Sequence, residues 1–328
     1  MNYILFDGTV RNTLLPFTFT RPVADIRVGI LTIREKWEMY LGHTTTTLTE
    51  EYLMEKFPMV EMEENVMVNA SFLPNEVLVE MISNLENNQA IVYQEEIVAF
   101  FTTDTQEEVD FDKYDLIEYE GDVIQIQNTW DIFEKNDIAI REDFDYLTQD
   151  RKSEPIPKSV NVIASENIFI EEGAKLEFVT LNASTGPIYI GKNAEIMEGS
   201  VIRGPFALCE EAQVKLGSKV YGATTVGPHS RIGGEVNNSV LFGYSNKGHD
   251  GFLGNSVLVS TNIFGSGFPR NFVPSFSWGG ASGFTTYITK KAFETAKIVM
   301  GRRKVEFTEE DAKIMEHIFE ETKKFRKE

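Results

Sequence analysis

Residues 190–232 read IGKNAEIMEGSVIRGPFALCEEAQVKLGSKVYGATTVGPHSRI, and an aliphatic side chain recurs at every sixth position of this stretch. A helix repeats about every 3.6 residues and a strand every two, so a period of six belongs to neither. It is typical of a β-solenoid in which three hexapeptides form one coil. The positions in register are Ile190, Ile196, Ile202, Leu208, Val214, Val220, Val226 and Ile232.

The position four residues after each aliphatic one is also restricted, because it holds a small residue in six cases of seven. Aliphatic side chains stacked inside the coils, with small side chains at tight corners, account for both regularities. The sequence therefore predicts a left-handed parallel β-helix. The residues at the restricted position are Ala194, Ser200, Phe206, Ala212, Ser218, Thr224 and Ser230.

The six-residue rule breaks down on both sides of this block. Upstream, Val162, Ile168 and Ala174 share one phase, but the step from residue 174 to residue 190 is 16, which is not a multiple of six. The segment LNASTGP at 181–187 is therefore predicted to form a loop that resets the register. Downstream, the rule weakens in EVNNSVLFGYSNKGHDGFLGNSVL at 235–258, and we expect the chemically active side chains there.

The first 150 residues alternate between short apolar runs and helical patterns. Strands that alternate with helices are typical of a mostly parallel sheet covered by helices, so we expect an α/β domain here. A helical pattern of apolar side chains over residues 28–41 stops at Gly42. The remaining expected elements are strands at 2–7, 44–49, 65–70 and 89–94, and helices at 51–57 and 74–87.

A charged, proline-containing segment, TQDRKSEPIPKS at 148–159, separates the two regions. Near the end of the chain, Thr308 followed by three acidic residues predicts the start of an amphipathic helix. We expect this helix to cover the open end of the β-helix. The expected parts are an α/β domain at 1–152, the β-helix at 153–287 and a helical cap at 288–328.

Composition limits the partners of this chain. Asp and Glu outnumber Lys and Arg by 51 to 31, and the formal charge of −20 repels nucleic acid and anionic membranes. Cys209 is the only cysteine, which excludes an intrachain disulfide and a Cys-based zinc site and suits a reducing compartment. No run of about 18 apolar residues occurs, so no membrane-spanning segment is expected. We expect a cytoplasmic protein, and no His, Asp or Glu spacing predicts a metal site.

Three segments and the hexapeptide block together resemble the bifunctional N-acetylglucosamine-1-phosphate uridyltransferase/glucosamine-1-phosphate N-acetyltransferase family, in a divergent GlmU-like form. The resemblance covers nearly the whole chain. It implies an enzyme of amino-sugar nucleotide synthesis with a sugar-nucleotidyltransferase-like N-terminal domain and a β-helical acyltransferase domain. It also implies a homotrimer that binds a sugar phosphate and a nucleotide. The segments are LLPFTFTRPVADIR at 14–27, SNKGHDGFLG at 245–254 and FPRNFVPSFSWGG at 268–280.

In the N-terminal domain, two departures from the family concern charge. Val23 stands where the family has a lysine, and the strand NVMVNASFLP at 65–74 has no acid where the family has a carboxylate for Mg²⁺. Uridylyl transfer with Mg²⁺ is one hypothesis, and it requires another source of charge stabilisation. The resemblance implies a nucleotide-binding loop that contains Gly8, Arg11, Pro16, Thr18 and Arg21.

In the β-helix, SNKGHDGFLG places His249 on the family's catalytic histidine. A neutral imidazole there would accept a proton from the sugar amine during acetyl transfer from acetyl-CoA to glucosamine 1-phosphate. Asn246 and Lys247 are candidates for binding the sugar phosphate, and Phe252 replaces the family's tyrosine. From the residues alone, His249 could also be a surface-turn histidine and Lys247 a solvated lysine.

The chain after Leu258 departs from the family, because it runs almost directly into the Gly/Phe-rich segment where further acetyl-CoA-binding coils are expected. This shortening, together with the missing acid and lysine, motivates an alternative to the enzyme. The alternative is a non-catalytic scaffold or sugar-nucleotide-binding protein that retains both folds. His229 and His317 have no partner pattern and are expected to be exposed structural residues.

Overall fold

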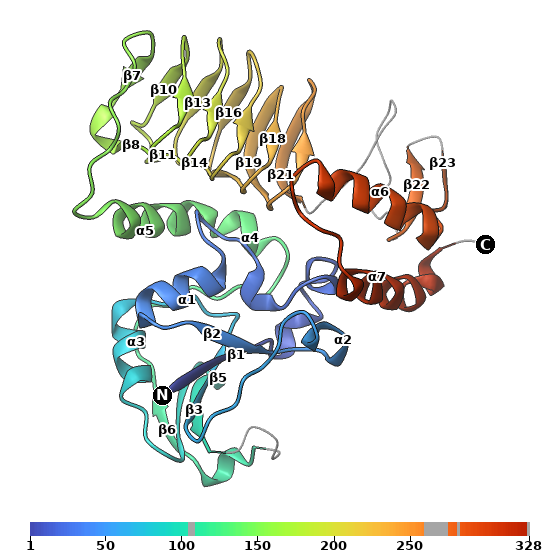
Figure 1. The fold of residues 1–328 in the computed structure, drawn as a ribbon. Coiled ribbons are helices and arrows are strands. Elements are labelled where there is room, and N and C mark those ends of the chain that lie inside the picture. The colour runs from blue at the N-terminus through green and yellow to red at the C-terminus, as the bar shows by residue number, and fades with distance from the viewer. Residues whose placement is uncertain (104–108, 259–274, 281–282, 327–328) are drawn as a thin grey trace. The chain divides into compact units, whose positions relative to one another are not determined.

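The structure is a computed structural model that describes residues 1–103, 109–258, 275–280 and 283–326. The chain forms two compact units, one of Met1–Leu48 with Met59–Ser260 and the other of Thr49–Pro58 with Thr261–Glu328. The first unit contains an α/β domain and a solenoid, and the second contains the C-terminal helices (Figure 1). The chain just after Leu258 and most of FPRNFVPSFSWGG lie outside the described residues.

The α/β domain is built on one six-stranded sheet with the order β2-β1-β3-β5-β4-β6. β1 is parallel to β2 and β3, and β4 is parallel to β6, whereas β5 is antiparallel to both of its neighbours. We predicted a mostly parallel sheet and did not predict β5. Because β5 is antiparallel to β3 and β4, the sheet is mixed. Its strands are β1 Asn2–Phe6, β2 Thr45–Leu48, β3 Asn65–Asn69, β4 Gln89–Tyr93, β5 Glu96–Thr102 and β6 Asp115–Glu118.

The first helix, α1 Ile33–Leu41, begins later than the apolar pattern from residue 28 predicts. Thr32 sets its start, because its hydroxyl accepts a hydrogen bond from Glu35 N while the Glu35 carboxylate accepts one from Thr32 N. Gly42 ends the helix, as predicted, and adopts the left-handed conformation. The other α-helices of the first unit are α3 Glu76–Ser83, α4 Asp131–Glu134 and α5 Asn136–Thr148, of which α4 and α5 were not predicted.

The predicted hexapeptide coils are confirmed. The aliphatic residues from Ile190 to Ile232 are each at most 1% exposed, and so are the residues four positions after them. Leu208 pairs with Val226, the aliphatic residue of the third hexapeptide after it, so three hexapeptides make one coil. The strands are parallel and stack in about five coils (Figure 1).

The solenoid has three faces. One face stacks β7, β10, β13 and β16, a second stacks β8, β11, β14 and β17, and the third stacks β9, β12, β15, β18 and β20. The strands of the first two faces are β7 Asn161–Ile163, β8 Ile168–Ile170, β10 Thr180–Asn182, β11 Ile188–Ile190, β13 Val201–Arg203, β14 Phe206–Leu208, β16 Lys219–Tyr221 and β17 Thr224–Val226. Those of the third are β9 Lys175–Leu176, β12 Glu195–Ile196, β15 Gln213–Val214, β18 Arg231–Ile232 and β20 Asn246–Lys247.

The predicted phase upstream of the regular block is wrong for Ile168 and Ala174, whereas Val162 pairs with Leu181 and so lies in the column of Ile202. A longer connection between β10 and β11 does reset the register, since Ile170 pairs with Ile190, whereas a coil of three hexapeptides would pair it with Ile188. Ile170 is therefore the interior aliphatic residue of its coil. Ile168 pairs with Ile188, in the column of the restricted small positions. The predicted phase through Ile168 and Ala174 is consequently displaced by two positions.

Beyond Ile232 the coil becomes shorter. Val226 pairs with Leu241, and Ile232 pairs with Lys247, so each of these coils falls half a repeat short of three hexapeptides. The long strand β19 Glu235–Leu241 runs along two faces, because it pairs with β16 at its start and with β17 at its end, and β21 Phe252–Leu258 pairs along it. The shortening changes which residues face the interior just where chemistry was expected.

α5 joins the α/β domain to the solenoid. Asn136, its first residue, accepts a hydrogen bond from Gly29 N at 2.8 Å and donates one to Ala223 O at 3.1 Å. Thr225 of β17 donates its hydroxyl proton to Gly29 O at 3.0 Å. These polar groups satisfy one another across a buried joint, which explains why both domains belong to one compact unit.

The second unit contains two longer helices and a short hairpin. The hydroxyl of Thr308 accepts a hydrogen bond from Asp311 N and the Asp311 carboxylate accepts one from Thr308 N, so the predicted helix start is confirmed. Tyr52 stacks on His317 with 3.9 Å between ring centroids. No helix among the described residues is apolar over a membrane-spanning length. The elements are α2 Glu51–Met54, β22 Ser277–Gly280, β23 Gly283–Thr286, α6 Thr289–Gly301 and α7 Glu309–Glu321.

Candidate functional site

The N-terminal candidate site begins where the chain leaves β1. β2 and β3 flank β1 on opposite sides, so the chain leaves the neighbouring strands β1 and β3 in opposite directions. A point where the strand order reverses in this way is a topological switch point, and ligands of α/β sheets bind in the crevice outside the strand ends there. β1 is followed by Asp7 and Gly8, and β3 ends at Asn69. A Cβ placed on Gly8 would lie 3.4 Å from Oδ1 of Asn69. The two strand ends therefore meet at the edge where we predicted the nucleotide-binding loop.

Gly8, Arg11 and Thr18, three of the residues predicted to bind the nucleotide, lie in one folded loop. The Arg11 guanidinium donates to Thr18 O at 3.1 Å, and the Thr18 hydroxyl donates to Arg11 O at 2.8 Å. Nε of Arg11 lies 3.5 Å from one carboxylate oxygen of Asp7, and the other oxygen accepts from Val23 N at 2.7 Å. Val23, at the family's lysine position, thus contributes its backbone N–H to closing the loop.

Pro16 and Arg21 occupy other parts of this loop. Pro16 is exposed and precedes a short 3-10 turn. The guanidinium of Arg21 lies 5.2 Å from the ring centroid of Phe242, a solenoid residue, and Phe17 lies 5.5 Å from the same ring. Burial lowers the pKa of Arg21, while the negative charge of Asp25 opposes this shift. Arg21 therefore lies at the junction between the loop and the solenoid.

A carboxylate that we did not predict lies at the same strand edge. Glu96 begins β5, whose antiparallel course brings it to the end of β3. One carboxylate oxygen accepts from Asn69 Nδ2 at 3.4 Å and the other from Gln125 Nε2 at 2.7 Å. The preceding turn runs through Gln94 and Glu95 at positive φ. Such turns usually carry Asn or Gly, so no turn signal in the sequence marks this hairpin.

Glu96 is a carboxylate of the kind that Mg²⁺ prefers, whereas Asn69 does not direct its amide oxygen toward it. Mg²⁺ is usually held by one or two carboxylates, with water and substrate phosphates completing its shell. Glu96 offers the carboxylate, whereas Asn69 points its Nδ2 at that carboxylate, and its Oδ1 accepts a hydrogen bond from Ser71 N at 3.0 Å. No group of three or more His, Cys, Asp or Glu side chains that could hold a metal occurs in the part of the chain that the structure describes. A single carboxylate suits a shared ion better than a metal held by protein alone.

The second candidate site lies at the corner where the solenoid coil shortens. His249 follows β20 and is exposed. Asn246 is also exposed and pairs with Arg231 of β18. Lys247 occupies the alternate position on the strand and is half-buried, with its ammonium donating to backbone carbonyl groups. Arg231, which is exposed beside Asn246, is a cation that the sequence pattern did not single out.

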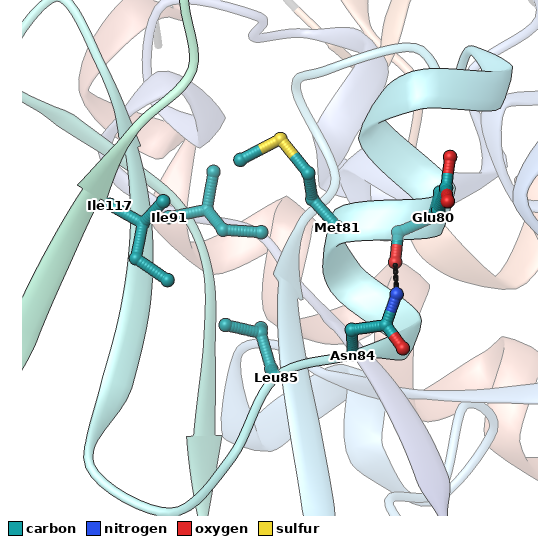
Figure 2. Close-up of a pocket in the computed structure, with 6 residues that line it drawn as sticks. All are labelled: Glu80, Met81, Asn84, Leu85, Ile91 and Ile117. Carbon is teal, nitrogen blue, oxygen red and sulfur yellow. Dashed lines mark hydrogen bonds between the residues drawn. The ribbon is translucent and has the colours of Figure 1, made fainter.

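A shallow cavity of about 290 Å³ lies between α3 and the strands β4 and β6. Figure 2 shows the side chains of Met81, Leu85, Ile91 and Ile117 directed toward one another around it. Its remaining lining residues are Glu80 and Asn84, and Asn84 donates to Glu80 O at 2.8 Å. None of the residues predicted for nucleotide or sugar binding lines this cavity, so it is separate from both candidate sites.

Comparison with known proteins concerns the first of the two domains. Residues 3–152 match a family model described as sugar nucleotidyl transferase. The match begins in β1 and ends after α5, so it spans the whole mixed sheet and the Gly8 loop. No curated protein matches the chain. The matched domain supports a transferase, and together with the solenoid it is consistent with a GlmU-like organisation.

Proposed function

We propose that this chain is a sugar nucleotidyltransferase whose N-terminal domain joins a nucleoside triphosphate to a sugar 1-phosphate. The similarity of residues 3–152 to the sugar nucleotidyl transferase family carries this proposal. The position of the Gly8 loop at the switch point of the sheet supports it, because phosphates bind at such strand ends. In this reaction a phosphate oxygen of the sugar attacks the α-phosphorus, and the α–β bridge breaks to release pyrophosphate.

In this proposal Gly8 lets the triphosphate approach the backbone, because it has no side chain and adopts a φ of +60° that other residues rarely take. Arg11 keeps the loop folded through its contacts with Asp7 and Thr18. Glu96 would hold Mg²⁺, which when bound neutralises charge on the phosphates. A carboxylate on β5 thus replaces the acid that is missing from β3.

Pyrophosphate release from UTP and N-acetylglucosamine 1-phosphate, measured across a range of Mg²⁺ concentrations, tests the proposal. Glu96→Gln should lower kcat by at least about 100-fold, because it removes electrostatic stabilisation of the transferring phosphoryl group. Glu95→Gln changes the exposed neighbouring carboxylate and is the matched control. If wild-type protein binds the sugar nucleotide in a calorimeter but releases no pyrophosphate at any metal concentration, the non-catalytic alternative holds.

A second activity, acetyl transfer from acetyl-CoA to glucosamine 1-phosphate, is proposed for the solenoid. The exposure of His249 on a corner where the coil departs from its regular length favours this activity. His249 would accept a proton from the attacking amine while the thioester carbon forms a bond to nitrogen and releases CoA thiol. Asn246 and the neighbouring Arg231 would meet the sugar phosphate. We propose a homotrimer for this form, which sedimentation equilibrium can test.

Thiol release from acetyl-CoA measures this second activity. His249→Ala should abolish turnover. His229→Ala is the matched control, because His229 also lies on a solenoid corner but is engaged by Glu211, 3.0 Å from its Nδ1. Equal turnover in the wild type and in the His249→Ala variant would remove His249 from the mechanism.

A further inference from the structure

Lys247 occupies a position that belongs to the core of the solenoid. On the third face, Val214 pairs with Ile232, and Ile232 pairs with Lys247. Val214 and Ile232 are fully buried. The lysine therefore follows them in the interior column, where the repeat calls for an aliphatic side chain. A charged group at the end of such a column needs polar partners.

The Lys247 ammonium has three such partners. It donates to the backbone oxygens of Gly233, of His249 at 3.0 Å and of Gly251 at 2.7 Å. An ammonium has three protons to donate, so these carbonyls match its capacity. Burial lowers the pKa of Lys247, and the Asp250 carboxylate opposes the shift. Two of the three carbonyls belong to the turn that carries His249.

The shortened coil explains why carbonyl groups gather here. Ile232 pairs with Lys247 before three hexapeptides are complete, so the corners on either side of them approach closely. At Gly234, which has a φ of +74°, an added Cβ would lie 2.8 Å from both the nitrogen and the oxygen of Gly251. Converging carbonyl oxygens repel one another, and a cation between them removes that repulsion. The Lys247 ammonium thus donates to carbonyl groups from both of these corners.

We propose that Lys247 is a positioning residue whose ammonium holds the His249–Gly251 turn against the preceding coil, and is not a ligand for the sugar phosphate. Its effect on turnover rests on the acetyl transfer proposed above. Its effect on the turn does not rest on acetyl transfer, because the hydrogen bonds lie within the protein. A positioning role predicts an amine that is occupied by backbone carbonyls, whereas a ligand role predicts an amine that the sugar phosphate protects from reaction.

Reductive methylation of the native wild-type protein, followed by mass spectrometry, measures how accessible the amine is. Lys247 should react at least about tenfold more slowly than Lys219, an exposed lysine of β16, because three hydrogen bonds occupy its protons. Added glucosamine 1-phosphate should leave the Lys247 rate unchanged. Equal rates for the two lysines, or protection of Lys247 by the sugar phosphate alone, would overturn the proposal.

Variants provide the second readout. Lys247→Met should speed amide hydrogen exchange at Glu235, whose N–H donates to Gly251 O at 3.1 Å, by about tenfold or more, whereas Lys219→Met should not. In the acetyl transfer assay, Lys247→Met should lower kcat with an unchanged KM for the sugar phosphate, and Lys247→Arg should recover part of it. A rise in KM alone would identify a phosphate ligand and refute the positioning role. If the wild-type protein lacks acetyl transfer activity, the acetyl transfer proposal fails. Slow methylation of Lys247 would still support its role in holding the turn.

Discussion

Replacing Lys36 with methionine should remove about 3 kcal/mol from the free energy of unfolding of the first unit. Lys36 of α1 forms an ion pair with Asp143 of α5, and both side chains are only 4% exposed. The second carboxylate oxygen of Asp143 accepts hydrogen bonds from Ile30 N at 2.6 Å and from Leu31 N at 3.1 Å. The variant thus leaves a buried carboxylate that has lost its counter-charge but keeps two backbone donors.

The expected magnitude follows from these contacts. Breaking a buried pair by removing one partner costs about 3–5 kcal/mol, and the two remaining N–H donors place Lys36→Met at the low end. Asp143→Asn should cost more, because it leaves a buried ammonium facing an amide. The double variant, Lys36→Met with Asp143→Asn, has no unpaired charge. Its loss of stability should therefore be about 2 kcal/mol smaller than the sum of the two single losses.

Urea unfolding followed by circular dichroism measures these differences as shifts of the midpoint at a constant slope. Lys219→Met removes a lysine from an exposed pair with Glu235, and its midpoint should match that of the wild type. A Lys36→Met loss below about 1 kcal/mol, the range of surface pairs, would refute the reasoning. So would a double variant that loses the full sum, since the two side chains would then act independently.

Three further results are expected. Burial raises the pKa of the Cys209 thiol from 9.0 to about 11, so the thiol loses its proton at a lower pH in the unfolded chain than in the folded one. The free energy of unfolding should therefore fall by about 2 kcal/mol as the pH rises between these values. In a pH series of urea midpoints, Cys209→Ala should flatten this dependence. Ile196→Ala, at a 1% exposed core position, should cost about 2–4 kcal/mol in urea unfolding, whereas Leu216→Ala, at a 65% exposed corner, should cost far less. Thr308→Ala should lower the thermal midpoint of α7 by removing a cap worth about 1 kcal/mol, and Thr308→Ser should preserve it, as monitored by circular dichroism.

The solenoid could be predicted because its signal is repeated and local. Each coil must place an aliphatic side chain inside, so the same requirement appears at every sixth residue from Ile190 to Ile232. The start of α1 could not be placed from apolar spacing, because Thr32 and not the first apolar residue decides it. The loop before Ile190 was foreseen, but the two extra residues between Val162 and Ile170 were not, and they place Ile170 in the interior instead of the predicted Ile168.

Glu96 escaped prediction because its role depends on strand order. In the sequence it stands 27 residues after Asn69, within a run that has no favoured turn residues. Only the antiparallel pairing of β3 with β5 brings the two side chains together. The missing acid on β3 is therefore weaker evidence against phosphoryl transfer than the sequence alone suggests, because the carboxylate can come from a neighbouring strand.

Lys247 illustrates the opposite case, where the register decides the role of a motif residue. A full coil of three hexapeptides after Ile232 would place Asp250 in the interior column, but the observed pairing places Lys247 there. A carboxylate among converging carbonyl oxygens would be repelled, whereas an ammonium is attracted to them. The shorter coil thus exchanges an unfavourable interior charge for a favourable one. The same exchange leaves His249 and Asp250 exposed at the corner, as the proposed acetyl transfer requires of His249.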